Sequence, residues 1–154
     1  MDYVALAAGY ERMIPFAHHI GIAIREIAPG TAVAVLPDAD ELKNHVGSQH
    51  AGALFTVAEA ASGGAFLGAF AEHLATLTPL AERAEIAYLK IARGPITASA
   101  ALRTPVDEVL AALDADGKAR FEVGVELHDE AGVEVGRVTV HWYVRRTAPA
   151  ETPA

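Results

Sequence analysis

The residues best suited to chemistry are grouped in a polar loop and in the apolar stretch that follows it. Asn44 and His50 belong to the loop, and Glu59 is a lone carboxylate with apolar neighbours on both sides. A helix beginning near Ala51 would present free backbone N–H groups and the positive end of its dipole beside the loop. Donors that stabilise an anion, together with an acid whose surroundings disfavour its charge, are the components of an acyl-transfer site.

Glu59 is the candidate nucleophile, or the general base that activates a water molecule. The structural alternative is an acid on a solvated helix face. Because residues 57, 58, 60 and 61 are all apolar, the surroundings of Glu59 favour the functional interpretation.

The loop residues have both a chemical and a structural interpretation. His50 and the backbone N–H groups of Ala51 and Gly52 form a candidate oxyanion hole, because a helix N-terminus stabilises developing negative charge. Alternatively, His50 or Ser48 only caps the helix. Asn44 either orients an attacking water or ties the loop. Alternatively, it is a simple turn residue with no catalytic role.

Composition argues against several other classes of function. The 154 residues carry a formal net charge of −8 and no Cys. Nucleic acid and anionic membrane surfaces are therefore unfavourable partners, and disulfides and thiolate chemistry are excluded. The acidic start, Met1 to Tyr3, is unlike a signal peptide. We expect a cytoplasmic protein.

The stretch from Ala51 to Ala71 is long enough to raise the question of a membrane span. It is rich in Ala and Gly, and a span would place Glu59 deep in lipid at a cost of roughly 2.5–3.5 kcal/mol. A helix buried inside a folded domain explains the same composition better.

Seven His residues raise the question of a metal site. His45, His50 and Glu59 could be drawn as ligands, but their spacing matches no zinc signature. The sequence therefore predicts no metal site.

Hydrophobic periodicity and turn signals predict three helices and six strands. The helices are expected at 2–14, from 51 to about 77 with Thr78-Pro79 as its end, and at 104–117 with Thr104 as N-cap. The strands are expected at 21–27, 31–36, 84–93, 96–102, 121–128 and 133–144. Residues 147–154 form a polar, Pro-bearing tail that we expect to be disordered.

This order predicts a single α+β domain over residues 1–146, in which six largely antiparallel strands wrap around a long central apolar helix. Gly63, Gly64 and Gly68 would let that helix approach the sheet or a partner closely.

The order of elements and the loop-to-helix segment resemble the hotdog-fold acyl-CoA thioesterases of the phenylacetate-degradation (PaaI) type and a related, uncharacterised thioesterase-like branch. In that family an Asn is followed six residues later by the His of a His-Gly-Gly triplet. An Asp or Glu stands nine residues after the His. Asn44, His50 and Glu59 keep this spacing.

Two positions depart from the family pattern. Ala51 stands where the first Gly of the triplet usually is, and its methyl group would narrow the space beside a thioester carbonyl. One turn after the acid, where some members carry a hydroxyl residue, this chain has Gly63, with Ser62 next to it. Both departures bear on how active such a site would be.

The resemblance implies two sites at the interface of a homodimer. Each would combine the helix N-terminus of one subunit with the acid of the other, with pantetheine in a channel between them, and whether dimers pair into tetramers stays open. Substrate contacts would involve Ala51, Gly52 and Ser62, while Lys90 and Arg93 would pair with coenzyme A phosphates unless they are solvated strand charges. Coenzyme A enters as part of the substrate, and no other cofactor is expected.

The leading hypothesis is an acyl-CoA thioesterase that hydrolyses a thioester to a carboxylic acid and free coenzyme A. Two alternatives remain open. A hotdog hydratase or dehydratase would pair a His with an acid for proton shuttling. An acyl-binding hotdog protein would keep the fold without turnover, as the Ala51 departure would allow.

Overall fold

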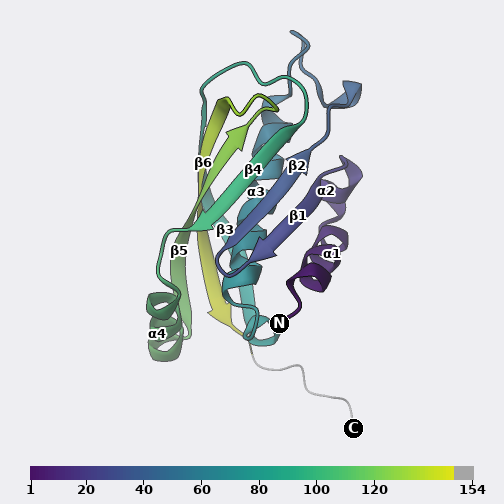
Figure 1. Cartoon of the computed structure of the whole chain (residues 1–154). Coiled ribbons are helices and arrows are strands. Elements are labelled where there is room, and N and C mark those ends of the chain that lie inside the picture. Colours follow the sequence, from purple (N-terminus) through teal and green to yellow (C-terminus); the bar gives the residue numbers. More distant parts are fainter. Residues whose placement is uncertain (148–154) are drawn as a thin grey trace.

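A computed structural model describes residues 1–147 as one antiparallel sheet with a long helix packed across one of its faces (Figure 1). Two single turns of 3-10 helix lie at Asp40–Leu42 and Leu74–Thr76. Most of the tail predicted to be disordered, residues 148–154, lies outside the described residues. The main elements are α1 (Tyr3–Met13), α2 (Pro15–His19), β1 (Ala23–Ala28), β2 (Thr31–Leu36), α3 (Ala51–Ala69), β3 (Leu77–Tyr88), β4 (Ile96–Leu102), α4 (Val106–Asp116), β5 (Lys118–His128) and β6 (Glu134–Arg146).

The six strands pair in the order β1-β2-β4-β5-β6-β3, and every neighbouring pair is antiparallel. β1 and β3 are therefore the two edges of the sheet. The turn between β1 and β2 contains Gly30, whose φ of 74° suits a residue without a side chain. The predicted α+β hotdog arrangement, a six-stranded sheet around a central helix, is confirmed.

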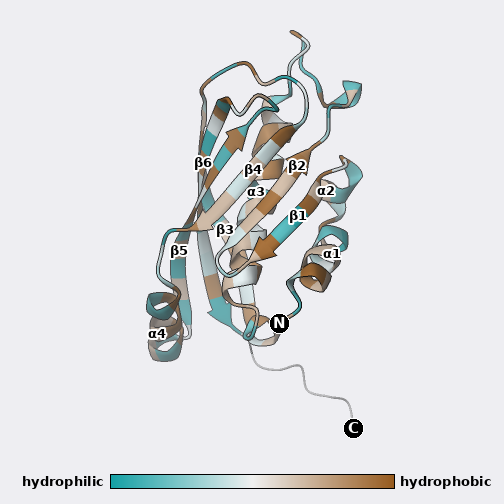
Figure 2. Cartoon of the chain, in the orientation of Figure 1, coloured by the Kyte–Doolittle hydropathy of each residue, from teal (hydrophilic) through white to brown (hydrophobic). Residues whose placement is uncertain are grey.

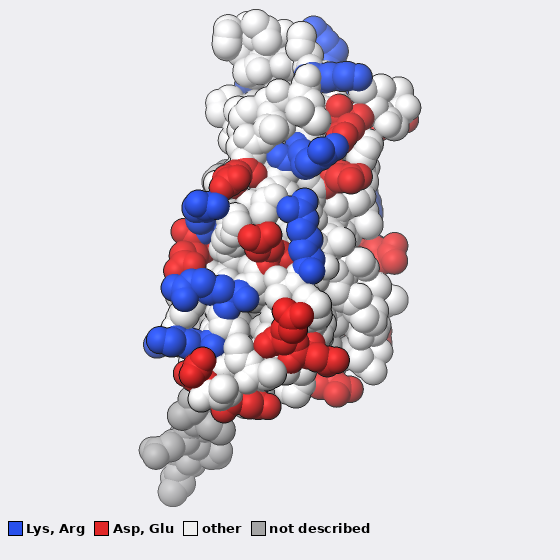
Figure 3. All heavy atoms as spheres, turned by 90° about the vertical axis from the view of Figure 1, so that its left-hand side faces the viewer, with Lys and Arg blue, Asp and Glu red and all other residues white. Residues whose placement is uncertain are grey.

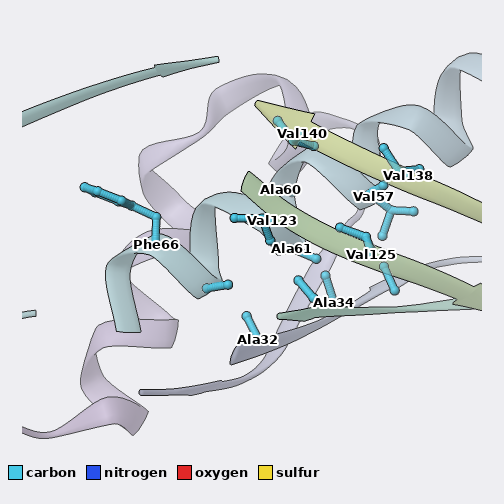
Figure 4. Packing of buried hydrophobic residues seen from close by; sticks show 14 of the residues in the cluster. Ala32, Ala34, Val57, Ala60, Ala61, Phe66, Val123, Val125, Val138 and Val140 are labelled. Atoms are coloured by element: carbon cyan, nitrogen blue, oxygen red, sulfur yellow. The ribbon is translucent and has the colours of Figure 1, made fainter. Parts of the chain in front are cut away.

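Side chains alternate between the two faces of the sheet, and one face packs on α3. Figure 2 shows brown and teal residues alternating along β5 and β6, in line with the alternating burial of both strands. In Figure 4, small residues of α3 lie close to valines of these strands. They are Val57, Ala60 and Ala61 of the helix, and Val123, Val125, Val138 and Val140 of the sheet.

α3 is apolar on most of its sides, as a helix enclosed by a sheet must be. By length and composition it could cross a membrane, but most of it is buried inside the fold. At its C-terminal end it carries Phe66 and Phe70, whose ring centroids are 5.0 Å apart, and Phe66 stacks on Phe121 at 5.4 Å. Bulky aromatic residues thus fill one end of the core, whereas alanine and valine fill the middle.

Two glycines of α3 set how closely it approaches β1 and β2. A Cβ atom at Gly64 would lie 2.9 Å from the Cβ of Ala32, and a Cβ atom at Gly68 would overlap the backbone oxygen of Ala28. A backbone oxygen cannot rotate away as the end of a side chain can. The absence of a side chain at Gly68 is therefore a condition for this packing.

The predicted end of the long helix was wrong. α3 ends at Ala69 instead of about Leu77, and Thr78 and Pro79 lie inside β3, where Pro79 is paired with Val144 of β6. Proline is compatible with this position because β3 is an edge strand, and its missing N–H can face away from the ladder. β3 also begins and ends earlier than the predicted strand at 84–93.

Two details at helix starts also differ from the prediction. Pro15 ends α1 as expected, but it also begins the short helix α2, a position that suits its fixed φ angle. Thr104 does not cap α4, whose N-cap is Pro105. The Thr104 hydroxyl oxygen instead accepts a hydrogen bond from the Glu122 N–H at 3.0 Å, so it links the start of α4 to β5.

The close packing of α3 predicts opposite effects for two Gly→Ala substitutions. Gly68→Ala should lower the free energy of unfolding by about 1–3 kcal/mol or more, because the added methyl group has no space beside Ala28. Gly9→Ala, in α1 with no atom within 4 Å of the new Cβ, should raise it by roughly 0.5–1 kcal/mol. Urea unfolding of both variants checks this, and a neutral Gly68→Ala would contradict the packing described here.

Candidate active site

The loop before α3 is organised around the side chain of Asn44. Its Oδ1 accepts hydrogen bonds from the N–H groups of Val46 (3.0 Å) and Ser48 (3.1 Å), and its Nδ2 donates to the Ser48 Oγ at 2.9 Å. Gly47 completes the turn with a φ of 71°. The Asn44 side chain thus ties the loop, which was one of the two roles expected for it. Its polar atoms form their hydrogen bonds within the loop itself.

Gln49 anchors the loop to the rest of the domain, a role that sequence reasoning missed. Its side chain is 3% exposed, and its Nε2 donates to the Pro37 oxygen (3.0 Å) and the Gly94 oxygen (2.9 Å). Within residues 1–147 its Oε1 is buried without a hydrogen-bond partner. A Gln in a polar loop carries no sequence signal for burial, because the two carbonyls it binds come from distant parts of the chain.

His50 is the N-cap of α3. Its Nδ1 accepts a hydrogen bond from the Gly52 N–H at 2.9 Å, so the neutral ring carries its proton on Nε2, and His50 is exposed. A Cβ atom at position 52 would lie 3.1 Å from this Nδ1, so glycine lets the ring close over the helix end. The Nδ1 atom of His50 therefore caps the helix, as the structural alternative expected. The Nε2–H on the other side of the ring can still donate a hydrogen bond to a ligand.

The cap changes which backbone groups can bind an anion. The sequence predicted that the N–H groups of Ala51 and Gly52 act together, but the Gly52 N–H is taken by His50. Leu54 donates to the His50 oxygen at 3.0 Å. Within the described residues the N–H of Ala51 has no partner, and Ala51 is exposed. Ala51 and the Nε2 of His50 are the donors that face outward.

Glu59 lies two turns into α3 and is half-buried. In the described part of the chain its carboxylate forms no hydrogen bond and no ion pair. Burial away from water disfavours the charged form and raises the pKa of Glu59 above its ordinary value of 4.5. An unpaired carboxylate with a raised pKa is a candidate general base.

Ser62 does not occupy the position predicted for a substrate-binding residue. It is fully buried, its Oγ donates to the Glu59 backbone oxygen at 2.7 Å, and it accepts from the Trp142 Nε1 at 3.2 Å. The first hydrogen bond lies within α3, and the second connects α3 to β6. Ser62 therefore supports the helix at Glu59, and its hydroxyl faces the core.

A hollow of about 400 Å³ lies between the loop before α3 and the segment that follows β3. Tyr88 crosses it, donating its hydroxyl to the Ala51 oxygen at 3.2 Å. Lys90 lines this hollow, whereas Arg93 does not, although both residues were predicted to bind substrate. The other lining residues are Asn44, Ser48, Gln49, Ala51, Leu54, Leu89, Ile91 and Ala92.

A larger hollow, of about 660 Å³, lies on the outer face of the sheet over β2, β4 and β5. None of the predicted site residues lines it. Figure 3 shows basic and acidic side chains interspersed over one outer side of the molecule, with no continuous basic surface in that view. Several charged residues of the sheet are paired across or along strands, such as Arg120 with Glu82 at 2.8 Å and Arg137 with Glu134 at 2.7 Å.

Glu59 and the start of α3 are too far apart to act together within one chain. Glu59 lies eight positions after Ala51, which is about 12 Å along the helix axis. Glu59 also does not line the hollow at the helix start. If the two act on one carbonyl group, they must come from two copies of the chain.

The described residues contain no cluster of three or more His, Cys, Asp or Glu side chains that could hold a metal ion.

The chain matches one protein-family model, the Domain of unknown function (DUF4442), over residues 4–144. A search of curated proteins found no match.

Solved structures match nearly the whole chain. A Pseudomonas aeruginosa protein of unknown function, named a probable thioesterase, is 28% identical with a TM-score of 0.83, and the match covers 94% of this chain and 95% of that one. PaaI from the Escherichia coli phenylacetic acid degradation operon is 20% identical with a TM-score of 0.72, covering 94% of each chain. A thioesterase family protein from Silicibacter pomeroyi is 18% identical with a TM-score of 0.76, covering 94% of this chain and 99% of that one. The chain therefore belongs to the DUF4442 family and has the hotdog fold of thioesterase-family proteins.

Proposed function

We propose that the protein is an acyl-CoA thioesterase that hydrolyses a thioester to a carboxylic acid and free coenzyme A. The observation that carries the proposal is the half-buried carboxylate of Glu59, which has no partner among residues 1–147, on a helix at whose start the N–H of Ala51 is likewise without a partner in that range. The fold shared with proteins named thioesterases supports the same class of reaction.

In the proposed reaction the thioester oxygen accepts hydrogen bonds from the Ala51 N–H and the His50 Nε2–H. Glu59 removes a proton from a water molecule, and the water oxygen attacks the carbonyl carbon. The tetrahedral intermediate then collapses, the carbon–sulfur bond breaks, and the departing thiolate takes the proton from Glu59. The raised pKa of Glu59 favours general-base action over direct attack, because a base is most effective when its pKa approaches the working pH.

We further propose that the active form is a homodimer joined along β3. Within residues 1–147, β3 is an edge strand, so the backbone N–H and C=O groups along its outer side pair with no other strand. Edge strands of this length pair readily with another chain. Large apolar side chains are exposed on β3, just after it and on α3, and a second copy would cover them. They are Phe55, Leu80, Tyr88, Leu89 and Ile91.

The dimer would bring the start of one α3 to the acid of the other, which the 12 Å separation within one chain requires. Lys90, at the rim of the hollow, and the exposed Arg93 would then face the phosphates of coenzyme A.

A second candidate is an acyl-CoA-binding protein without turnover. It is favoured by Ala51, whose methyl group lies at the helix end where the carbonyl oxygen of a substrate would be held. The two candidates share a ligand and differ in the chemical step, so one assay separates them.

Glu59→Gln should reduce thioester hydrolysis by about 100-fold or more, because a Gln side chain cannot accept the proton of water. The purified protein is tested on a panel of short, medium and aryl acyl-CoAs by release of free thiol. The matched control is Glu72→Gln, which removes the same charge from an exposed position. Saturable binding of acyl-CoA by an inactive parent protein would favour the second candidate instead.

The variants His50→Asn and His50→Ala separate the helix-capping role of His50 from its proposed catalytic role in the same assay. Asn is a good N-cap and should keep most of the stability, whereas Ala should lose about 0.5–2 kcal/mol. Both lack the Nε2–H, so both should show slower hydrolysis. Full activity in His50→Asn would assign His50 to capping alone.

The raised pKa of Glu59 also predicts a stability effect that depends on pH. Because the folded state binds this proton more tightly than the unfolded chain, stability falls as the pH rises from 4.5 through the raised pKa. Glu59→Gln should therefore melt at a higher temperature than the parent at pH 7.5, and the difference should close as the pH is lowered toward 4.5. Thermal unfolding across this range, with Glu72→Gln alongside, measures it. Equal melting temperatures at pH 7.5 would contradict a costly burial of the charge.

A further inference from the structure

The space beside Gly63 is occupied by a hydroxyl group from another helix. Gly63 follows Glu59 by one turn on α3 and is fully buried. A Cβ atom built on Gly63 would overlap the Tyr10 Oη and would lie 3.2 Å from the Tyr10 Cζ. Tyr10, from α1, therefore places its oxygen close to where a serine or threonine hydroxyl at position 63 would lie.

Tyr10 is buried, with 6% of its surface exposed, and its Oη donates a hydrogen bond to the Ala60 backbone oxygen at 3.0 Å. Because the proton is used in this way, the lone pairs of the oxygen remain as acceptors. Burial raises the pKa of Tyr10, and the nearby Glu59 raises it further, so the hydroxyl stays neutral. Side chains at positions 59 and 63 of a helix are neighbours, with Cβ atoms about 5–6 Å apart.

The other polar groups around this part of α3 are engaged elsewhere. The Ser62 hydroxyl binds the Glu59 backbone oxygen and Trp142. The Glu11 carboxylate, next to Tyr10 on α1, accepts from the Ile24 N–H at 2.9 Å. A phenylalanine would fill the volume of the Tyr10 ring equally well, so the hydroxyl is the feature that packing alone does not explain.

We infer that Tyr10 is a positioning residue for Glu59 and supplies, from α1, the hydroxyl that position 63 lacks. The inference rests on the proposed role of Glu59 as general base. When Glu59 has taken a proton from water, its carboxylic acid donates a hydrogen bond to the Tyr10 Oη. This contact holds the acid in one orientation until the proton passes to the departing thiolate. Tyr10 itself gains and loses no proton.

Removing this one oxygen should slow the reaction without unfolding the protein. Tyr10→Phe should lower kcat about tenfold and leave KM within about twofold, as expected for loss of one hydrogen bond made during the reaction. The control is Tyr3→Phe, on the same helix, which should leave kcat unchanged. The acidic limb of the kcat profile should move to lower pH in Tyr10→Phe, because the protonated form of Glu59 has lost a partner.

Moving the hydroxyl back to α3 should restore the reaction. Gly63→Ser alone should destabilise the protein, because its Cβ overlaps the Tyr10 Oη. In the double variant Tyr10→Phe with Gly63→Ser the overlapping Oη is gone, and the ring has to shift only slightly because its Cζ lies 3.2 Å from the new Cβ. The kcat value should then recover relative to Tyr10→Phe. Tyr10→Phe with Gly63→Ala adds the same Cβ without a hydroxyl and should not recover.

One measurement decides the inference even if the protein hydrolyses no thioester. The pKa of Glu59, followed by NMR of its carboxyl carbon, should be lower in Tyr10→Phe than in the parent and should rise again in the Gly63→Ser double variant. An unchanged or higher pKa in Tyr10→Phe would overturn the role of Tyr10. Absence of turnover in the parent, with the pKa changes as expected, would overturn the proposed function and leave the Tyr10–Glu59 contact standing.

Discussion

The packing of α3 against the sheet is the constraint on which the other features depend. Gly64 and Gly68 let the helix lie close to β1 and β2, and the sheet then covers the helix on most sides. Only a narrow strip of the helix surface stays partly open to solvent. It begins at Ala51 and includes Phe55 and Glu59. An acid on such a strip is only half solvated, which is why burial perturbs its pKa.

The helix start is fixed as firmly as the helix body, but by hydrogen bonds instead of apolar contacts. The Asn44 side chain closes the loop, and Gln49 joins it to two carbonyls, those of Pro37 and Gly94. His50 then caps the first turn through Nδ1. The result is a rigid arrangement in which one backbone N–H and one ring N–H point outward, as preorganised stabilisation of an oxyanion requires.

Sequence patterns predicted those parts of the molecule that local rules determine. Strands β5 and β6 alternate clearly, and the turn at Gly30 marks the first hairpin. The spacing of Asn44, His50 and Glu59 located the loop and the helix that carry the candidate site.

The parts that sequence did not predict depend on the topology of the sheet, on side-chain orientation or on contacts between distant segments. Pro79 lies within a strand because β3 is at the edge of the sheet, a fact of topology. The Gly52 N–H is occupied because the His50 ring folds back over it. Gln49 is buried by carbonyls from two other segments, and Tyr10 reaches Gly63 from α1. None of these contacts leaves a periodic trace in the sequence.

We propose that each site combines the helix start of one subunit with Glu59 of another. Ala51→Pro tests the helix start cleanly, since proline suits the first turn of a helix and removes only the N–H. Each of the variants Ala51→Pro and Glu59→Gln should be inactive alone. The two are mixed in equal amounts, unfolded together and refolded, so that hybrid dimers form. We expect recovery of about a quarter of the parent's thioesterase activity, because half of the dimers then contain one intact site. Hybrids that stay as inactive as the two single variants would contradict a site shared between subunits.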